Sequence, residues 1–310
     1  MRGGPVAVID CGTNTTRLLI TDGGASDALR RAEITRLGAG VGSSGRLDGA
    51  AMERTWDCLR SFRRAIDAHR PTAVAVVATS AVRSASNSSE FLDRAESILG
   101  TAPQILSGRE EAELSFKGAV SDLAPGRGDV PWLVVDIGGG STELSLGEAE
   151  CREAVSLDIG SVRLTEMFIE HDPPLPEELA SCLSVIGLHL HDALLSVPAL
   201  ADPCRMVGVA GTVTTVAEVE MGLLTYDRDL IHHFDLRDDA VEDVFRTLAT
   251  DSLADRVHHP GLHPDRAEVI VGGLCILAKI MRFFEFGDCI VSERDLLDGV
   301  ALGLLDAPRR

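Results

Sequence analysis

Lysine is scarce in this sequence. It occurs only at Lys117 and Lys279, so nearly every positively charged side chain is an arginine, which is better suited to bind phosphate through two parallel hydrogen bonds. A GC-rich genome would produce the same bias. The 48 acidic residues outnumber the 29 basic ones, which gives a net charge of −19. This charge argues against nucleic acid or an anionic membrane as the main partner, so any polyanion must be bound by a local group of donors.

Paired cysteines and long apolar segments are missing as well. The seven cysteines are scattered, and none forms a Cys-x-x-Cys pair. We therefore expect reduced and mostly buried thiols, as in a cytosolic protein. The N-terminus lacks the pattern of a signal peptide, and no apolar run is long enough to span a bilayer. The sequence thus predicts a soluble, cytoplasmic protein that does not interact with membranes.

An internal repeat is the first positive feature. Residues 6–20 and 133–146 align at an offset of 126 residues, which matches Asp10 with Asp136, Gly12 with Gly138 and Thr16 with Thr142. Each copy has an apolar strand that ends in Asp, a tight turn and a second strand, and this pattern predicts a β-hairpin. A chain of 310 residues is long enough for about two domains.

Helices and strands alternate after each hairpin. In the first half we expect helices at 48–69, 89–99 and 109–120 and strands at 72–79 and 104–106. In the second half we expect helices at 176–195, 238–249 and 265–284, strands at 205–210 and 288–291, and a final helix. The pattern predicts an α/β protein of two duplicated lobes, 1–125 and 126–310, with mixed sheets flanked by helices and a cleft between the lobes.

The second hairpin carries the strongest motif, residues 136–143. Three consecutive glycines leave backbone N–H groups open to a phosphoryl group, and two hydroxyls follow them. The predicted phosphate-binding residues are Gly138, Gly139, Gly140, Ser141 and Thr142. Asp136 and Glu143 are hard oxygen ligands that suit Mg²⁺ or Mn²⁺. The alternative is a glycine hairpin whose carboxylates have no special role.

Two further segments could bind phosphate. In the first hairpin the candidates are Gly12, Thr13, Asn14, Thr16 and Arg17, with Asp10 as a metal ligand. The third segment is a strand that runs into a helix at Gly211 and Thr212, where the free amides of the helix N-terminus face an anion. By itself this last signal is weak, because Gly-Thr turns are common before helices.

The paired hairpins and the third segment resemble the phosphate-binding loops of the actin/Hsp70/sugar-kinase superfamily, which implies ribonuclease-H-like (actin-like ATPase) lobes. Residues 106–118 and 78–83, together with 157–166 and 264–270, resemble the exopolyphosphatase/guanosine pentaphosphate phosphatase family over nearly the whole chain. In that family a Glu of the Ser-Gly-x-Glu-Glu-Ala segment is the catalytic base. The resemblance therefore favours Glu111, with Glu110 as its neighbour, while Arg83 is a candidate phosphate ligand. The alternatives are helix-dipole stabilisation for the glutamates and a surface ion pair for Arg83.

The resemblance implies hydrolysis of the terminal phosphoanhydride of polyphosphate, with guanosine pentaphosphate as the alternative substrate. A small-molecule kinase and a non-catalytic sensor of polyphosphate or (p)ppGpp stay open, as does a homodimer. One departure concerns the segment 292–299, where Leu297 stands in place of the family's arginine. The chain also ends at Arg310 without the extra C-terminal domains of longer members, so we expect a preference for short chains.

Overall fold

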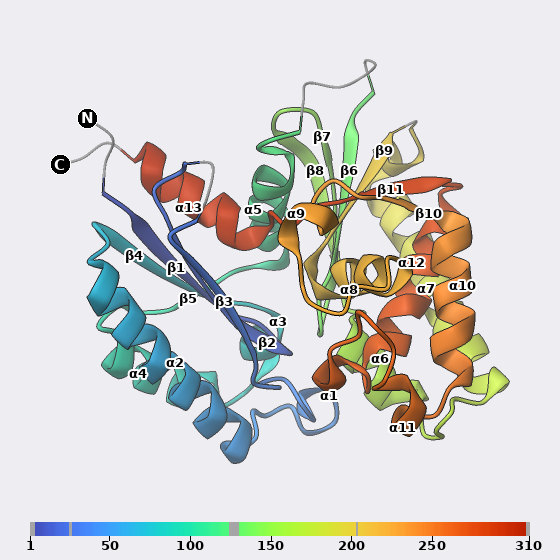
Figure 1. The fold of residues 1–310 in the computed structure, drawn as a ribbon, viewed down its shortest axis with the longest axis horizontal. Coiled ribbons are helices and arrows are strands. Elements are labelled where there is room, and N and C mark those ends of the chain that lie inside the picture. Colours follow the sequence, from blue (N-terminus) through green and yellow to red (C-terminus); the bar gives the residue numbers. More distant parts are fainter. Residues whose placement is uncertain (1–3, 25–26, 124–129, 203, 308–310) are drawn as a thin grey trace. The chain divides into compact units, whose positions relative to one another are not determined.

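The computed structural model describes residues 4–24, 27–123, 130–202 and 204–307 (Figure 1). Packing divides the chain into two compact units: unit 1 contains residues 1–118 and 296–310, and unit 2 contains residues 119–295. The expected boundary between residues 125 and 126 lies outside the described residues. The expected lobes 1–125 and 126–310 also differ from these units at the C-terminus, because the last helix packs within unit 1.

Unit 1 is built on a mixed sheet, in which the described strands follow the order β3-β2-β1-β4-β5. The strands are β1 (Val6–Cys11), β2 (Thr15–Thr21), β3 (Leu29–Ile34), β4 (Ala73–Ala78) and β5 (Gln104–Ile105). β1 and β2 form the predicted antiparallel hairpin, and β3 extends it. β4 runs parallel to β1 and β5 runs parallel to β4, so three strands end at the same edge of the sheet.

Helices cover both faces of this sheet. They are α1 (Val41–Ser44), α2 (Gly49–His69), α3 (Ser80–Ser84), α4 (Ser88–Leu99), α5 (Gly108–Val120) and α13 (Leu296–Asp306). The side chain of Asp48 caps α2 by accepting a hydrogen bond from the N–H of Ala51. α2 and α4 pack on the face that carries Leu18, whereas α13 packs on the opposite face around Leu19 (Figure 1). Leu297, the departure noted in the sequence, is a buried member of this second core.

Unit 2 repeats the same plan. Its described strands follow the order β10-β11-β9-β6-β7-β8. They are β6 (Trp132–Ile137), β7 (Thr142–Gly147), β8 (Cys151–Leu157), β9 (Arg205–Val209), β10 (Asp235–Arg237) and β11 (Asp288–Val291). β6, β7 and β8 form an antiparallel meander, while β9 and β11 extend it in parallel from β6. β6, β7, β8, β9 and β11 thus correspond to β1 to β5, and the predicted duplication is confirmed.

In unit 2, α6, α7, α8 and α10 pack against α12, which is buried on almost every side. The helices of this unit have the following bounds. They are α6 (Ser161–Phe168), α7 (Pro176–Ser196), α8 (Ala210–Glu220), α9 (Arg228–Ile231), α10 (Asp238–Thr250), α11 (Leu253–Arg256) and α12 (Ile270–Phe283), with 3-10 turns at Pro198–Ala201 and Pro264–Arg266. The helix predicted at 265–284 is therefore a 3-10 turn followed by α12. The sequence patterns did not predict the strands β3, β8 and β10, the helix α6, or the short helices α1, α3, α9 and α11.

One described helix, α7, has the length and composition to cross a membrane, contrary to the expectation that no such segment exists. Cys182, Ile186 and Leu190 on this helix are buried in the core of unit 2. The seven cysteines are free thiols, and five of them are buried, as predicted.

Candidate active site

The predicted site residues of unit 1 lie at the edge where its parallel strands end. β1 is followed by the turn at Gly12, β4 by α3, and β5 by the first turn of α5. The register places Cys11 beside Ala78, and Ala78 beside Ile105. This edge of a parallel α/β sheet is where ligands usually bind, because loops and helix N-termini gather there.

Arg83 and Glu111 form a partly buried ion pair at this edge. Nη1 of Arg83 lies 3.0 Å from Oε2 of Glu111 and also donates to the carbonyl oxygen of Leu106 at 2.8 Å. The Glu111 side chain is 10% exposed and that of Arg83 is 26% exposed, so a part of each side chain remains at the surface. The pair therefore places a carboxylate that can accept a proton beside a guanidinium that can donate hydrogen bonds to phosphate oxygens.

Glu110 has a different role. Its Oε2 atom accepts hydrogen bonds from both the N–H and the hydroxyl of Ser107, and its own N–H donates to that hydroxyl. This reciprocal pattern is a capping box, which satisfies free amides at the start of α5. The backbone and side-chain hydrogen bonds from Ser107 lower the pKa of Glu110. Of the two candidate bases, only Glu111 contacts Arg83 among the contacts of the described residues.

The two hairpins have the same turn. The N–H of Gly12 donates to the carbonyl of Thr15 at 3.2 Å, and the N–H of Gly138 donates to the carbonyl of Ser141 at 3.0 Å, 126 residues further on. A Cβ atom at Gly12 would lie 2.8 Å from the Thr15 oxygen, so this turn requires glycine.

In the second hairpin, the carbonyls of Gly138 and Gly139 accept hydrogen bonds from the first amides of α6. Because C=O and N–H point in opposite directions across a trans peptide, the N–H groups of Gly139 and Gly140 point away from α6. Neither N–H donates to a backbone carbonyl among the described residues. Nε of Arg163 also holds the Gly140 carbonyl at 2.9 Å. Two adjacent amides are thus held in the arrangement that binds anions.

In the first hairpin, the carbonyls of Thr13 and Asn14 face the segment 35–38 in the same way. They accept hydrogen bonds from the N–H groups of Gly38, Thr35 and Arg36 at 2.8–3.0 Å.

The predicted phosphate ligands Thr16 and Thr142 do not present their hydroxyls to a ligand. Both are fully buried, and their hydroxyls bond to Thr35 Oγ1 and to the Ile159 carbonyl, respectively. These two hydroxyls therefore stabilise the hairpins through hydrogen bonds in the interior.

The two hairpins differ in the residue that lies opposite the Asp at the end of the first strand. In the first, Arg17 stands directly opposite Asp10 and donates to its Oδ2 from Nη2 at 2.7 Å and from Nε at 3.1 Å. In the second, the position opposite Asp136 is Glu143. Both of these carboxylates are at least 92% buried. Two neighbouring carboxylates offer oxygen ligands that suit a divalent cation, whereas Asp10 faces a guanidinium.

The third segment begins at Ala210, whose φ of 68° is rare for a residue with a side chain. Arg266 covers the next residue: a Cβ atom at Gly211 would lie 1.7 Å from its Nη1 atom. Arg266 lies in the segment 264–270 that carries part of the family resemblance, but its contact with Gly211 could not be predicted from the sequence. Thr212 is 5% exposed and packs against Gly273 of α12. Further along α8, burial and the charge of Glu293 raise the pKa of Glu218 to about 7, although Arg266 opposes the shift.

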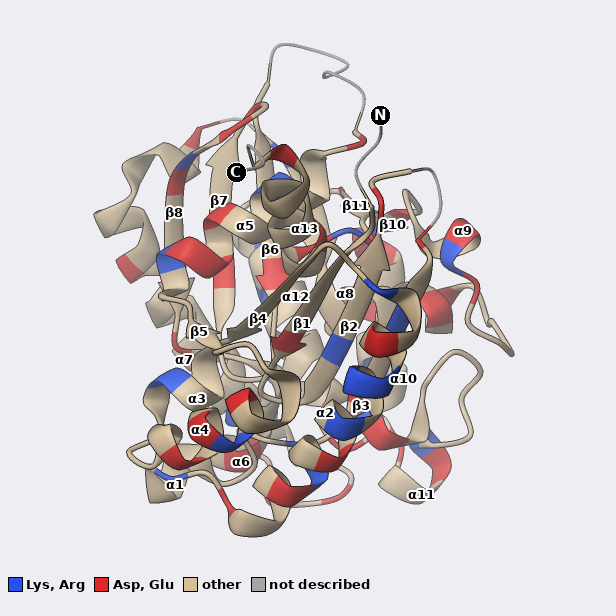
Figure 2. Cartoon of the chain, turned by 90° about the vertical axis from the view of Figure 1, so that its left-hand side faces the viewer, with Lys and Arg blue, Asp and Glu red and all other residues tan. Residues whose placement is uncertain are grey.

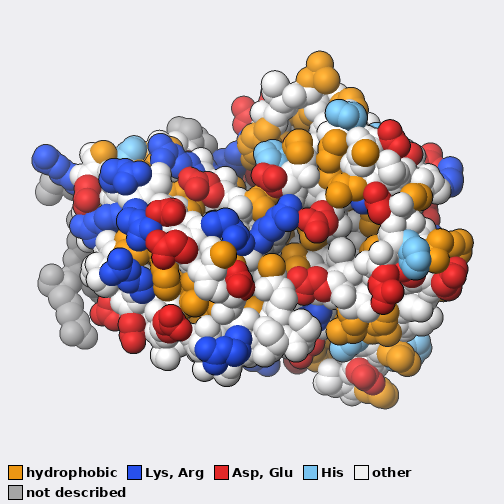
Figure 3. Space-filling model, turned by 90° about the horizontal axis from the view of Figure 1, so that it is seen from below, with side chains coloured by type: hydrophobic (Ala, Val, Ile, Leu, Met, Phe, Trp, Pro, Cys, Tyr) orange, Lys and Arg blue, Asp and Glu red, His pale blue; other side chains and the backbone are white. Residues whose placement is uncertain are grey.

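Charge is distributed unevenly between the units. Unit 1 has 17 basic and 16 acidic residues, whereas unit 2 has 12 and 32, so their net charges are +1 and −20. Figure 2 marks these residues along the chain, and Figure 3 shows basic side chains gathered in one region with acidic ones among them. Unit 1 by itself is therefore close to neutral, and the excess of negative charge belongs to unit 2.

Comparison with known proteins agrees with the resemblance seen in the sequence. The profile of the Ppx/GppA phosphatase family matches residues 19–307. The chain is 38% identical to exopolyphosphatase 2 of Mycobacterium tuberculosis, with 96% of this chain and 98% of that protein covered. It is 31% identical to a guanosine-5'-triphosphate,3'-diphosphate pyrophosphatase of Vibrio vulnificus, over 98% of this chain and 60% of that protein. The crystal structure of an exopolyphosphatase from Cytophaga hutchinsonii matches with a TM-score of 0.88 at 28% identity, covering 98% of this chain and 99% of that one.

These matches extend over both units and confirm the expected two-lobed fold. The family profile covers the second hairpin, the segment of Arg83 and Glu111, and α13 alike. The chain belongs to the Ppx/GppA phosphatase family.

Proposed function

We propose that this protein is a metal-dependent exopolyphosphatase, which releases phosphate from the end of inorganic polyphosphate. The observation that carries the proposal is the Arg83–Glu111 ion pair at the edge of the sheet of unit 1. It joins a carboxylate able to take a proton from water with a guanidinium able to bind phosphate oxygens. The M. tuberculosis relative, which the match covers almost entirely, bears the name exopolyphosphatase 2, which supports this substrate.

In the proposed reaction, Glu111 orients a water molecule and takes its proton as the water attacks the terminal phosphorus. Charge builds up on the phosphoryl oxygens in such a reaction, so donors fixed in advance supply most of the catalysis. Arg83 is one such donor. Arg17 provides a further cation in unit 1, and in unit 2 the N–H groups of Gly139 and Gly140 form a separate group of anion donors.

We further propose that Asp136 and Glu143 hold a divalent cation, Mg²⁺ or Mn²⁺. Their places on paired strand positions fit this role, because carboxylate oxygens on neighbouring positions are ligands that a hard divalent cation prefers. When bound, the ion would neutralise phosphate charge. Asp10 is the weaker candidate for a ligand, since Arg17 holds one of its oxygens.

Guanosine pentaphosphate is the second candidate substrate, and the 31% identity to the Vibrio enzyme supports it. A phosphate-release assay decides between the two. Polyphosphates of several lengths, guanosine pentaphosphate and ATP would be supplied separately with Mg²⁺ or Mn²⁺. Release from polyphosphate at the highest kcat/KM is the expected result. Tight binding without release would indicate a sensor, and turnover of ATP only with an added hydroxyl acceptor would indicate a kinase.

We place the protein in the cytoplasm. The free thiols of all seven cysteines support this location, since such thiols are typical of a reducing compartment. Fractionation of cells that express the tagged protein would test it.

A further inference from the structure

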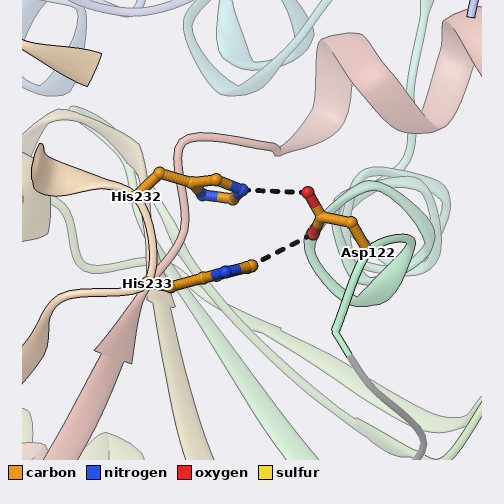
Figure 4. Close-up of side chains that lie close together, drawn as sticks. All are labelled: Asp122, His232 and His233. Carbon is orange, nitrogen blue, oxygen red and sulfur yellow. Dashed lines mark hydrogen bonds and ion pairs between the residues drawn. The ribbon is translucent and has the colours of Figure 1, made fainter. Parts of the chain in front are cut away.

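A cluster of four side chains lies in unit 2, outside the candidate active site: Asp122, His232, His233 and Arg294. Figure 4 shows the first three of them. Oδ2 of Asp122 lies 2.9 Å from Nε2 of His232 and 2.8 Å from Nε of Arg294. Oδ1 of Asp122 lies 3.4 Å from Nε2 of His233. The carboxylate of Asp122 thus contacts three nitrogen atoms, which come from residues 232–233 and from Arg294.

The backbone at His233 has an unusual conformation, and both histidines lie beside Asp122. His233 has a φ of 67°, which is uncommon for a residue other than glycine. Its ring and that of His232 lie 3.9 Å apart and face the same carboxylate (Figure 4). Such a strained residue persists only where its surroundings hold it in place.

The hydrogen bonds favour a proton over a metal ion between His232 and Asp122. The N–H of Glu293 donates to Nδ1 of His232 at 3.1 Å, so the ring proton is on Nε2 and points to the carboxylate. A histidine that binds a metal through Nε2 normally donates a proton from Nδ1, which this contact prevents. Arg294 already supplies a positive charge to the same oxygen. Partial burial would raise the pKa of Asp122, but the hydrogen bond from His232 and the charge of Arg294 outweigh it, and the pKa is lowered.

The position of the cluster in the chain suggests its role. The chain passes from unit 1 to unit 2 between residues 118 and 119, in the last turn of α5, and returns between residues 295 and 296, directly before α13. Asp122 and Arg294 lie just beyond these two passages, and Nη1 of Arg294 also donates to the hydroxyl of Ser121 at 3.2 Å. The cluster therefore ties together, within unit 2, the two segments that connect it to unit 1.

The same two segments also meet within unit 1. A Cβ atom at Gly299 of α13 would lie 1.9 Å from the carbonyl oxygen of Leu114 of α5, so the two helices are in close contact there. α5 carries Glu111 in its first turn and ends at Val120, two residues before Asp122. A continuous helix transmits a shift at one end to the other, because its backbone hydrogen bonds keep it stiff.

We propose that Asp122, His232, His233 and Arg294 form a clamp that fixes the C-terminal end of α5 and the segment 292–295 to unit 2, and that this clamp positions Glu111 through α5. Asp122 is in this sense a positioning residue, and it does not touch the substrate. The kinetic part of the proposal rests on the proposed hydrolysis, whereas the clamp itself rests only on the contacts above.

Asp122→Asn tests the proposal, because it removes the negative charge and keeps the size of the side chain. Hydrogen exchange of peptides that cover 119–122 and 292–296 should become faster. With tripolyphosphate, kcat should fall about tenfold with KM little changed, since a small displacement of a catalytic group lowers the rate of the chemical step. Unchanged exchange in both segments, or an unchanged kcat, would overturn the proposal.

Asp251→Asn is the matched control. Asp251 forms another His–Asp pair in unit 2, with its Oδ2 atom 2.5 Å from Nε2 of His259, far along the chain from both passages. It should alter neither kcat nor exchange in the two segments. A comparable loss of kcat in this control would show a general effect of weakening unit 2 and would also contradict the proposal. If Asp122→Asn fails to fold, His233→Asn replaces it, because asparagine tolerates positive φ, and it should act in the same direction.

Two further measurements separate the clamp from other roles. If Asp122 and Arg294 act through each other, the double variant Asp122→Asn/Arg294→Gln should lose no more activity than Asp122→Asn alone, whereas additive losses would contradict the clamp. Equilibrium dialysis with Zn²⁺ should show no binding that His232→Gln abolishes. Such binding would make the cluster a metal site and overturn the proposal. Should the wild type hydrolyse none of the candidate substrates, the proposed function fails, while the exchange experiment still decides the clamp.

Discussion

Arg83 and Glu111 are 28 residues apart in the sequence, and Nη1 of Arg83 lies 3.0 Å from Oε2 of Glu111. The pair forms because β4 and β5 are parallel neighbours and the segments that follow them start at the same edge of the sheet. Its geometry singles out Glu111 from the two adjacent glutamates, since Glu110 is engaged by Ser107.

We predict that Glu111→Gln lowers kcat by about two orders of magnitude or more, the usual effect of removing a general base. The side chains are nearly the same size, so the melting temperature should change little. Glu110→Gln serves as the control, because glutamine can also complete the capping box, and it should keep most of the activity. Steady-state phosphate release with both variants tests the assignment, which fails if Glu111→Gln keeps more than about a tenth of the wild-type kcat.

Gly160→Ala should weaken substrate binding without altering any proposed ligand. Its Cβ atom would lie 2.5 Å from the backbone of Gly139 and Gly140, so the loop that presents their N–H groups must shift. A hydrogen bond to a charged group contributes about 1.5–3 kcal/mol, so KM should rise about tenfold or more. Gly287→Ala, whose Cβ atom would meet nothing within 4 Å, should leave KM unchanged. An unaltered KM in a folded Gly160→Ala protein would remove this loop from the binding site.

The divergence of the hairpins predicts different effects of two matched substitutions. Glu143→Gln should raise the Mg²⁺ concentration for half-maximal activity by about tenfold or more, because it removes a carboxylate from the proposed cation site. Asp10→Asn should leave that concentration near the wild-type value and change KM, since Asp10 holds Arg17. Titration of activity with Mg²⁺ distinguishes the two, and full activity in excess chelator would eliminate the metal site.

Glu218 should make the protein less stable as the pH rises. Its pKa is about 7 in the folded state, above the ordinary value of 4.5, so the folded state binds the proton more tightly than the unfolded state. The contribution of Glu218 to the free energy of unfolding is therefore fully present below pH 4.5 and is lost as the pH rises towards 7. Glu218→Gln should flatten this decline, whereas Glu220→Gln on the exposed side of the same helix should not. Urea unfolding at pH 5 and pH 8 measures the effect, and equal slopes for all three proteins would contradict the assigned pKa.

Substrate length gives the last prediction. The donors identified here, namely the two hairpins, Arg83 and a bound cation, can neutralise only a few phosphates. Unit 2 carries a net charge of −20, which repels the rest of a long chain. We expect kcat/KM to reach a plateau at short chain length, with release of the substrate after each cleavage. Gel analysis of products at low enzyme concentration tests this. Intact long chains beside fully degraded ones would show processive cleavage and refute it.

Part of the fold could be predicted from local patterns. The hairpins, the duplication and most helices follow from alternation, glycine turns and periodicity, all of which a short window of sequence contains. β3 and β8 could not be predicted this way. β3 reads Leu-Arg-Arg-Ala-Glu-Ile and is mostly polar, and it is a strand because it pairs along its length with β2. The sequence also assigned α13 to the second lobe, because adjacency in the chain does not reveal that Leu297 packs beside Val6 and Leu19.

The same division applies to the site. The sequence by itself determined which chemical groups are present: glycine turns that leave amides open, carboxylates at the ends of strands, an arginine shortly after a strand and a glutamate at the start of a helix. Only the tertiary structure decided which of these groups meet. It paired Asp10 with Arg17 and placed Asp136 opposite Glu143, although the two hairpins share one pattern. It also used the hydroxyls of Thr16 and Thr142 as internal anchors. Pairing across strands and burial depend on distant segments, and a side chain acts on a ligand only if its neighbours leave its polar atoms available.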